Sequence, residues 1–187
     1  MKPIIISLFS GLLLFLSTSI DAQTHLRVGS GYYIWGSGDL LVPSVELEVR
    51  RDIGRWFSGG LEVNFGHYSS LGGSQEQFDY TFTTFASNQL LTFNLMNTDW
   101  MDLALVAGTS VRYQHQLLIT GNELRGVEEL EDGTFRYERN ILFGGHLRPE
   151  VHIHFSDIDK VNVAASSSLY RGGEIFSGMS LSYMRKF

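Results

Sequence analysis

The sequence contains no cysteine in its 187 residues, so neither a disulfide framework nor a lipid-anchored cysteine is available to it. Proline is rare, with 3 residues against 20 glycines, and aromatic residues make up 13% of the chain, a balance that favours β structure. Lysine occurs only at Lys2, Lys160 and Lys186, and the formal net charge is −6. Because neutralising phosphates needs clustered lysine and arginine, this composition argues against a nucleic-acid partner.

The one long apolar stretch lies at the amino terminus. Lys2 is followed by PIIISLFSGLLLFLSTSI and then by the junction DAQ, which is the arrangement of a secretory signal peptide. A transmembrane helix is the alternative, because the stretch approaches the ~18 residues that a span requires. Strand-like sequence follows at once, so we expect a signal peptide of residues 1–22. Residues 23–187 then have the size of a single mature domain.

Beyond this segment, apolar residues recur at every second position. In residues 101–113, Leu103 and Leu105 alternate with polar positions such as Asp102 and Arg112. Such alternation is typical of strands with one apolar and one polar face. Eight such runs are found, at residues 26–35, 43–50, 57–66, 91–95, 101–113, 150–155, 161–169 and 179–187.

The links between these runs differ in length in a regular way. Short breaks lie around Asp52, Thr98 and Ile158, whereas long polar links run from 67 to 82 and from 116 to 139. Short turns at one end and long loops at the other are typical of transmembrane β-barrels. We therefore predict an all-β fold, an eight-stranded antiparallel up-and-down transmembrane β-barrel. The stretch FDYTFTTF is also compatible with strands that extend beyond a membrane.

Alternation alone does not say which face lies inside, and a soluble lipocalin-like ligand-binding barrel would show the same period. The polar face mixes small residues such as Gly60 and Ala104 with charges of both signs, which suits a narrow bore better than a solvated sheet. Arg50 and His154 share this face. An eight-stranded lumen is just wide enough for side chains, so we expect a plugged bore rather than a pore. The predicted lumen polar network comprises Glu46, Glu48, Glu62, Asp102, Arg112, Arg148, Glu150 and His152.

The last run, SLSYMRKF, ends on an aromatic residue. Phe187, Tyr183 and Leu181 fall on one face of this run, a pattern that resembles the terminal signature of Gram-negative outer-membrane proteins. Arg185 departs from that pattern, which more often has an apolar residue there. The resemblance implies that Phe187, Tyr183 and Leu181 form a C-terminal insertion signal read by the barrel-insertion machinery.

The mature chain as a whole resembles the small eight-stranded outer-membrane barrels of the OmpX and OmpA-barrel type, including the proteins grouped as outer-membrane β-barrel domain or PorT-like. The resemblance rests on the signal peptide, the strand count, the unequal loops and Phe187. It implies a location in the cell outer membrane, contact with outer-membrane lipid and lipopolysaccharide, and a monomer. It further implies a structural or adhesive role, with the long loops open to a protein partner.

An enzyme is the remaining alternative. Lipid A deacylases of the PagL type use a histidine and a serine two apart on a barrel strand, as in His154 and Ser156 here, with Glu150 or Asp157 to orient the imidazole. Ser156, however, begins a short turn on the side away from the outer leaflet, and the fuller motif of that family is missing. A barrel without catalysis is therefore favoured.

A metal site is weighed in the same way. His146, His152 and His154 share one strand face, and imidazoles are good zinc or copper ligands. Neighbours two apart on a strand project in parallel and seldom converge on one ion. We therefore expect these histidines to pack in the lumen, and we expect no metal or cofactor.

Overall fold

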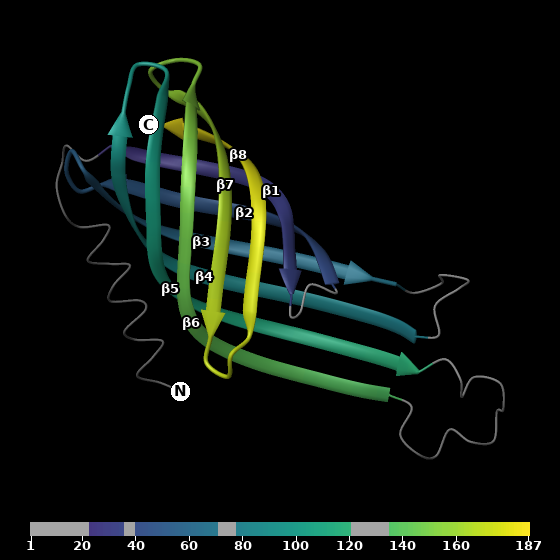
Figure 1. The fold of residues 1–187 in the computed structure, drawn as a ribbon. Helices are drawn as coiled ribbons and strands as arrows, with labels where there is room; N and C mark the ends of the chain where they lie inside the picture. The colour runs from purple at the N-terminus through teal and green to yellow at the C-terminus, as the bar shows by residue number, and fades with distance from the viewer. Residues whose placement is uncertain (1–22, 36–39, 71–77, 121–134) are drawn as a thin grey trace, which may run out of the picture.

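The computed structural model describes residues 23–35, 40–70, 78–120 and 135–187. Each strand pairs antiparallel with the next, and β1 pairs with β8, so the sheet closes into a barrel (Figure 1). This confirms the predicted eight-stranded antiparallel barrel, and the predicted signal peptide lies outside the described residues. No helix among the described residues is long and apolar enough to cross a membrane. The eight strands are β1 (Thr24–Trp35), β2 (Leu40–Asp52), β3 (Phe57–Ser69), β4 (Phe78–Asn97), β5 (Met101–Thr120), β6 (Phe135–His154), β7 (Asp159–Tyr170) and β8 (Ile175–Lys186).

The two ends of the barrel differ. At the turn end, β2–β3, β4–β5 and β6–β7 are joined by tight turns, such as the one closed by the bond from the Thr98 N–H to the Met101 carbonyl, 2.9 Å long. At the loop end, β7 and β8 are joined by a turn, which the Tyr170 N–H closes by bonding the Glu174 carbonyl at 2.9 Å. Figure 1 shows the carboxy terminus at the turn end. The three predicted short breaks are thus confirmed.

The apolar face of the sheet points outward and the polar face inward. Leu47 is 44% exposed on the outer wall, whereas its neighbour Glu48 is fully buried in the bore. The same holds on the far side of the barrel, where Val163 is exposed and Arg112 is buried. A water-soluble barrel has the opposite arrangement, so the lipocalin-like alternative is wrong.

Strands β4, β5 and β6 are much longer than the sequence pattern predicts. The structure has β4 beginning at Phe78 and β6 at Phe135, so the predicted runs 91–95 and 150–155 cover only parts of them, and the predicted link 116–139 is too long. The added part of β4 has polar residues on both faces, with Thr83 and Gln89 outward and Thr84 and Asn88 inward, so the two-residue hydrophobic period is lost although the backbone pairing continues. At the loop end of β6, Glu138 and Arg139 likewise put polar groups on opposite faces.

The longer strands leave one sheet edge open at the loop end. Pairing of β5 with β6 starts at Ile119 opposite Phe135, but pairing of β6 with β7 starts only at Gly144 opposite Tyr170. Residues 135–142 of β6 therefore have β5 on one side and no strand of the described chain on the other. Figure 1 shows β4, β5 and β6 continuing past the ends of β7, β8, β1 and β2.

Candidate functional site

Arg27 stands at the centre of the bore. Its Nε donates to Glu48 Oε2 at 2.8 Å, its Nη1 to Glu46 Oε1 at 2.9 Å and its Nη2 to Glu62 Oε2 at 2.5 Å. Strands β1, β2 and β3 supply these groups, because the register sets Arg27 opposite Glu48 and Glu48 opposite Glu62. One guanidinium therefore ties three neighbouring strands together.

Two further arginines complete this group. Arg148 donates to Glu62, donates from Nη2 to Glu48 Oε2 at 2.6 Å, and places its Nε 2.6 Å from Glu150 Oε1. Arg50 donates from Nε to Glu48 Oε1 at 2.7 Å and from Nη2 to Glu150 Oε2 at 2.9 Å. All these side chains are buried. We call this group the ionic layer: Arg27, Glu46, Glu48, Arg50, Glu62, Arg148 and Glu150.

The ionic layer joins opposite walls of the barrel, since β6 carries Arg148 and β2 carries Glu48. Four carboxylates face three guanidinium groups, and neutral donors add to them, as when Asn88 Nδ2 bonds Glu62 Oε1 at 2.7 Å. Desolvating such charges offsets much of their attraction, so the layer adds little net stability compared with apolar packing. Removing one partner, by contrast, leaves a buried charge uncompensated. The layer therefore links β1, β2 and β3 to β6 across the bore.

The predicted Asp102 does not join the ionic layer. Its Oδ2 lies 2.7 Å from Lys160 Nζ and 2.7 Å from His154 Nε2, nearer the turn end. His152 lies between the two groups, with its Nε2 2.8 Å from Glu150 Oε2. Asp102, His152, His154 and Lys160 line an open cavity of about 740 Å³ at the turn end. The predicted network is thus divided into a buried centre and a wetter mouth.

Arg112 also lies apart from the carboxylates that the sequence suggested as its partners. Its Nε donates to the Tyr170 hydroxyl at 2.8 Å and its Nη1 to Thr84 Oγ1 at 3.1 Å, and its Cζ stands 3.9 Å from the centre of the Phe176 ring. Among the described side chains no carboxylate forms an ion pair with it. The cation is held instead by ring faces and hydroxyl oxygens, a cation–π arrangement.

The rings around Arg112 cluster inside the bore, toward the loop end. We call this group the aromatic layer: Tyr33, Trp35, Phe82, Tyr170 and Phe176. Trp35 stacks on Phe82 with ring centres 4.8 Å apart, and its indole N–H donates to Glu174 at 3.3 Å. Two glycines make room for the rings, because a Cβ on Gly178 or Gly144 would come within 2.7 Å of the ring of Tyr33 or Tyr170.

The sequence prediction missed Arg27 and the aromatic layer. The signal for Arg27 was its parity, since it shares the inward face of β1 with Gly29, Gly31 and Tyr33 and lies opposite Glu48 once the hairpin is in register. The grouping of Tyr33 with Phe82, Tyr170 and Phe176 had no such signal. These residues come from distant strands, so only closure of the barrel brings them together.

The proposed catalytic pair is not assembled. His154 contacts Asp102, while the Ser156 hydroxyl donates to Asp159 at 3.2 Å and accepts the Asp159 N–H at 3.1 Å within the β6–β7 turn. No hydrogen bond joins His154 to Ser156 or Asp157 in the part of the chain that the structure describes.

The histidines of β6 have different nearest partners. His146 bonds Ser168 at 2.8 Å, the nearest carboxylate of His152 is Glu150 at 2.8 Å, and that of His154 is Asp102 at 2.7 Å, which lies 4.0 Å from His152. Within the described ranges, no three histidine or acidic side chains are grouped so that they could hold a metal ion.

The closing strand presents its apolar residues outward. Leu181, Tyr183 and Phe187 are all exposed on the outer wall, and the Phe187 N–H bonds the Thr24 carbonyl at 2.8 Å where β8 meets β1. The Tyr183 hydroxyl donates to Asp159, whose carboxylate also lies 3.8 Å from Arg185 Nε. Arg185 thus has a local acidic partner on the outer wall.

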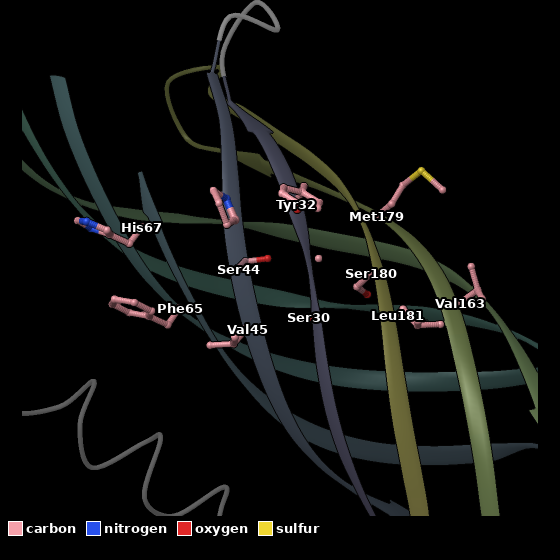
Figure 2. A pocket seen from close by; sticks show the side chains of 12 residues that line it. Ser30, Tyr32, Ser44, Val45, Phe65, His67, Val163, Met179, Ser180 and Leu181 are labelled. Carbon is pink, nitrogen blue, oxygen red and sulfur yellow. The ribbon is translucent and has the colours of Figure 1, made fainter. Parts of the chain in front are cut away.

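The outer wall is hollowed on the side of β1. A groove of about 700 Å³ crosses β3, β2, β1, β8 and β7 (Figure 2). Its floor includes the small residues Ser30, Gly31 and Ser180, and large side chains such as Phe65 and Met179 stand along its rim. The groove opens on the apolar face, outside the bore.

No protein-family model and no curated protein sequence matches the chain. Solved structures do match it. The fold is that of the small outer-membrane barrels. Ail, the attachment invasion locus protein of Yersinia pestis, aligns with a TM-score of 0.61 at 9% identity, over 90% of this chain and 100% of that one. A major outer membrane protein from Thermus thermophilus gives 0.64 at 11% identity, over 89% and 100%. Neisserial surface protein A gives 0.58 at 8% identity, over 89% and 97%.

Proposed function

We propose that this chain is a monomeric outer-membrane protein whose bore is plugged by the ionic and aromatic layers. The parts of β4, β5 and β6 that continue past the other strands are presented outside the cell to a protein partner. The observation that carries the proposal is the barrel's apolar outer wall and charged interior. Apolar side chains cover the outer wall, while the seven charged groups of the ionic layer, together with Asp102 and Arg112, are buried in the bore. A closed barrel also bonds its backbone internally, as a lipid environment demands.

The open edge of β6 supports a binding role. The Phe143 carbonyl accepts the Arg171 N–H at 2.9 Å, so the backbone groups of Phe143 point away from β5. Alternate residues of a strand point the same way, so the backbone groups of Tyr137, Arg139 and Ile141 also face the open side. An unpaired edge of this kind can accept a strand from another chain. The Ail structure solved with the heparin analogue sucrose octasulfate shows that another barrel of this fold binds a ligand.

We further propose that Leu181, Tyr183 and Phe187 serve as the insertion signal, since they lie outward on the strand that closes the barrel. Contact with outer-membrane lipid and lipopolysaccharide follows from the same outer wall. A catalytic role is not proposed, because His154 and Ser156 are engaged with different partners.

The absence of native cysteine gives a direct test of placement and orientation. Arg171→Cys puts a thiol at the loop end and Asp157→Cys puts one at the turn end. On intact cells, a membrane-impermeant maleimide should label the first variant, whereas the second should be labelled only after the outer membrane is opened. Labelling of Asp157→Cys alone on intact cells would reverse the orientation. Recovery of the protein in the soluble fraction would refute the outer-membrane proposal.

The same cells test the open edge. Tyr137→Pro removes one backbone N–H from the open edge of β6, whereas Tyr137→Ala removes the side chain and keeps that N–H. If a partner adds a strand here, adhesion of the cells to protein-coated surfaces should fall with Tyr137→Pro and persist with Tyr137→Ala. Equal adhesion of the two variants would argue against strand addition.

A further inference from the structure

The outward face of β3 to β6 changes character abruptly toward the loop end. Strand register aligns four exposed apolar side chains in one row, the apolar row: Phe65, Phe85, Tyr113 and Ile141. Two residues further along every strand, the same register aligns four hydrogen-bonding side chains, the polar row: His67, Thr83, His115 and Arg139. A boundary between apolar and polar surroundings therefore runs between the two rows.

The other half of the barrel has no such boundary. On β1, β2, β7 and β8 the outward side chains nearest the loop end remain apolar and exposed: Ile34, Leu41, Leu169 and Ile175. The polar row is therefore a local feature of β3 to β6 and is not a ring around the whole barrel.

Contacts within the polar row leave a cation facing outward. Arg139 is exposed, with its Cζ 4.7 Å from the centre of the Tyr137 ring, and the Tyr137 ring also packs edge-on against His115, with centres 4.7 Å apart. At the other end of the row, His67 Nδ1 lies 3.0 Å from Thr83 Oγ1. Among the described residues Arg139 forms no ion pair, so its N–H groups remain available to an anion.

The groove on the outer wall meets the polar row at His67. Figure 2 shows Phe65 and His67 projecting from β3 at one side of the groove, with Val45 and Leu181 beyond them. The groove reaches the polar row only at His67, three strands away from Arg139, so the surface beside Arg139 is the apolar row and not the groove.

We infer that Arg139 and its cross-strand neighbour His115 in the polar row bind the phosphate of an anionic membrane lipid, with Arg139 as the charged ligand and the exposed apolar row beside them as the surface on which the acyl chain lies. This inference rests on the proposed membrane location. Arginine recognises phosphate through several N–H donors at once, and a cation beside a bilayer gains from its negative surface.

The test uses the folded full chain in neutral detergent micelles and measures retained lipid by native mass spectrometry. The probes are phosphatidic acid, diacylglycerol with the same chains, and inorganic phosphate. We expect phosphatidic acid to be retained in preference to diacylglycerol, and Arg139→Gln to retain about fivefold less of it. His115→Gln should lower retention in the same direction. Arg171→Gln, which removes an exposed arginine at the same end but outside the row, should leave retention unchanged.

Equal retention by Arg139→Gln and Arg171→Gln would overturn the inference. Displacement of phosphatidic acid by excess inorganic phosphate would show a site for soluble anions and would overturn the assignment to a lipid. Heat-dependent gel migration of the same samples separates the two proposals. A folded barrel without lipid preference refutes this inference alone, whereas a chain that forms no barrel in detergent refutes the membrane location and this inference with it.

Discussion

The ionic layer and the aromatic layer lie in the same bore but are held together by different interactions. In the ionic layer, Arg148 meets three carboxylates, and every charge depends on partners from other strands. Arg112, which lies against the aromatic layer, is held by rings and hydroxyl groups. The same residue type thus balances carboxylate charges in one layer, whereas beside the other it bonds hydroxyl groups and packs against rings. Replacing Arg148 and Arg112 by the same residue, methionine, makes this difference measurable.

The largest effect is expected for Arg148→Met. The substitution keeps a long apolar side chain but leaves Glu48, Glu62 and Glu150 without one of their cations. We expect the free energy of unfolding to fall by about 3–5 kcal/mol, measured by urea titration in lipid vesicles with tryptophan fluorescence. The exposed Arg55→Met at the turn end is the control and should change it by less than about 0.5 kcal/mol. A loss below about 1 kcal/mol for Arg148→Met would show that the layer tolerates an unpaired charge.

Arg112→Met should cost less. The substitution removes the hydrogen bonds to Tyr170 and Thr84 and the contact with the Phe176 ring. It leaves no carboxylate without its cation, and Tyr170 keeps its hydrogen bond to Ser110. The expected loss is about 1–2 kcal/mol in the same titration. If the loss equals that of Arg148→Met, the distinction between the two layers is wrong.

Trp35→Phe should have the smallest effect of the three. Phenylalanine keeps a ring stacked on Phe82 and removes the N–H that donates to Glu174 at 3.3 Å. We expect the free energy of unfolding to fall by about 0.5–1.5 kcal/mol, measured through the fluorescence of the two remaining tryptophans. Trp56→Phe, at an exposed position near the turn end, provides the matched control and should be close to neutral. Equal losses for the two variants would mean that the bond to Glu174 contributes nothing.

The sequence predicted the barrel better than it predicted the contents of the bore. The alternation of apolar and polar residues, as at Leu47 and Glu48 or at Leu105 and Asp102, predicted where the strands run and which face of each is apolar. It could do so because successive side chains of a strand point to opposite faces of the sheet. The extents of β4 and β6 were underestimated, since their outer segments carry polar residues on both faces. Arg112 and Asp102 share the inward face with the glutamates, yet their positions along the bore depend on the register between strands.

What the sequence determined by itself is therefore local: where strands run, which face of each is apolar, and that charges of both signs share the other face. The tertiary structure decided the rest. Only closure of β1 on β8 brings Arg148 of β6 across the bore to Glu48 and Glu62, and only closure gathers Tyr33, Phe82, Tyr170 and Phe176 into one layer. The physical reason is that the side-chain period of a strand specifies a direction, whereas a partner across the bore is specified by the stagger of all the strands together.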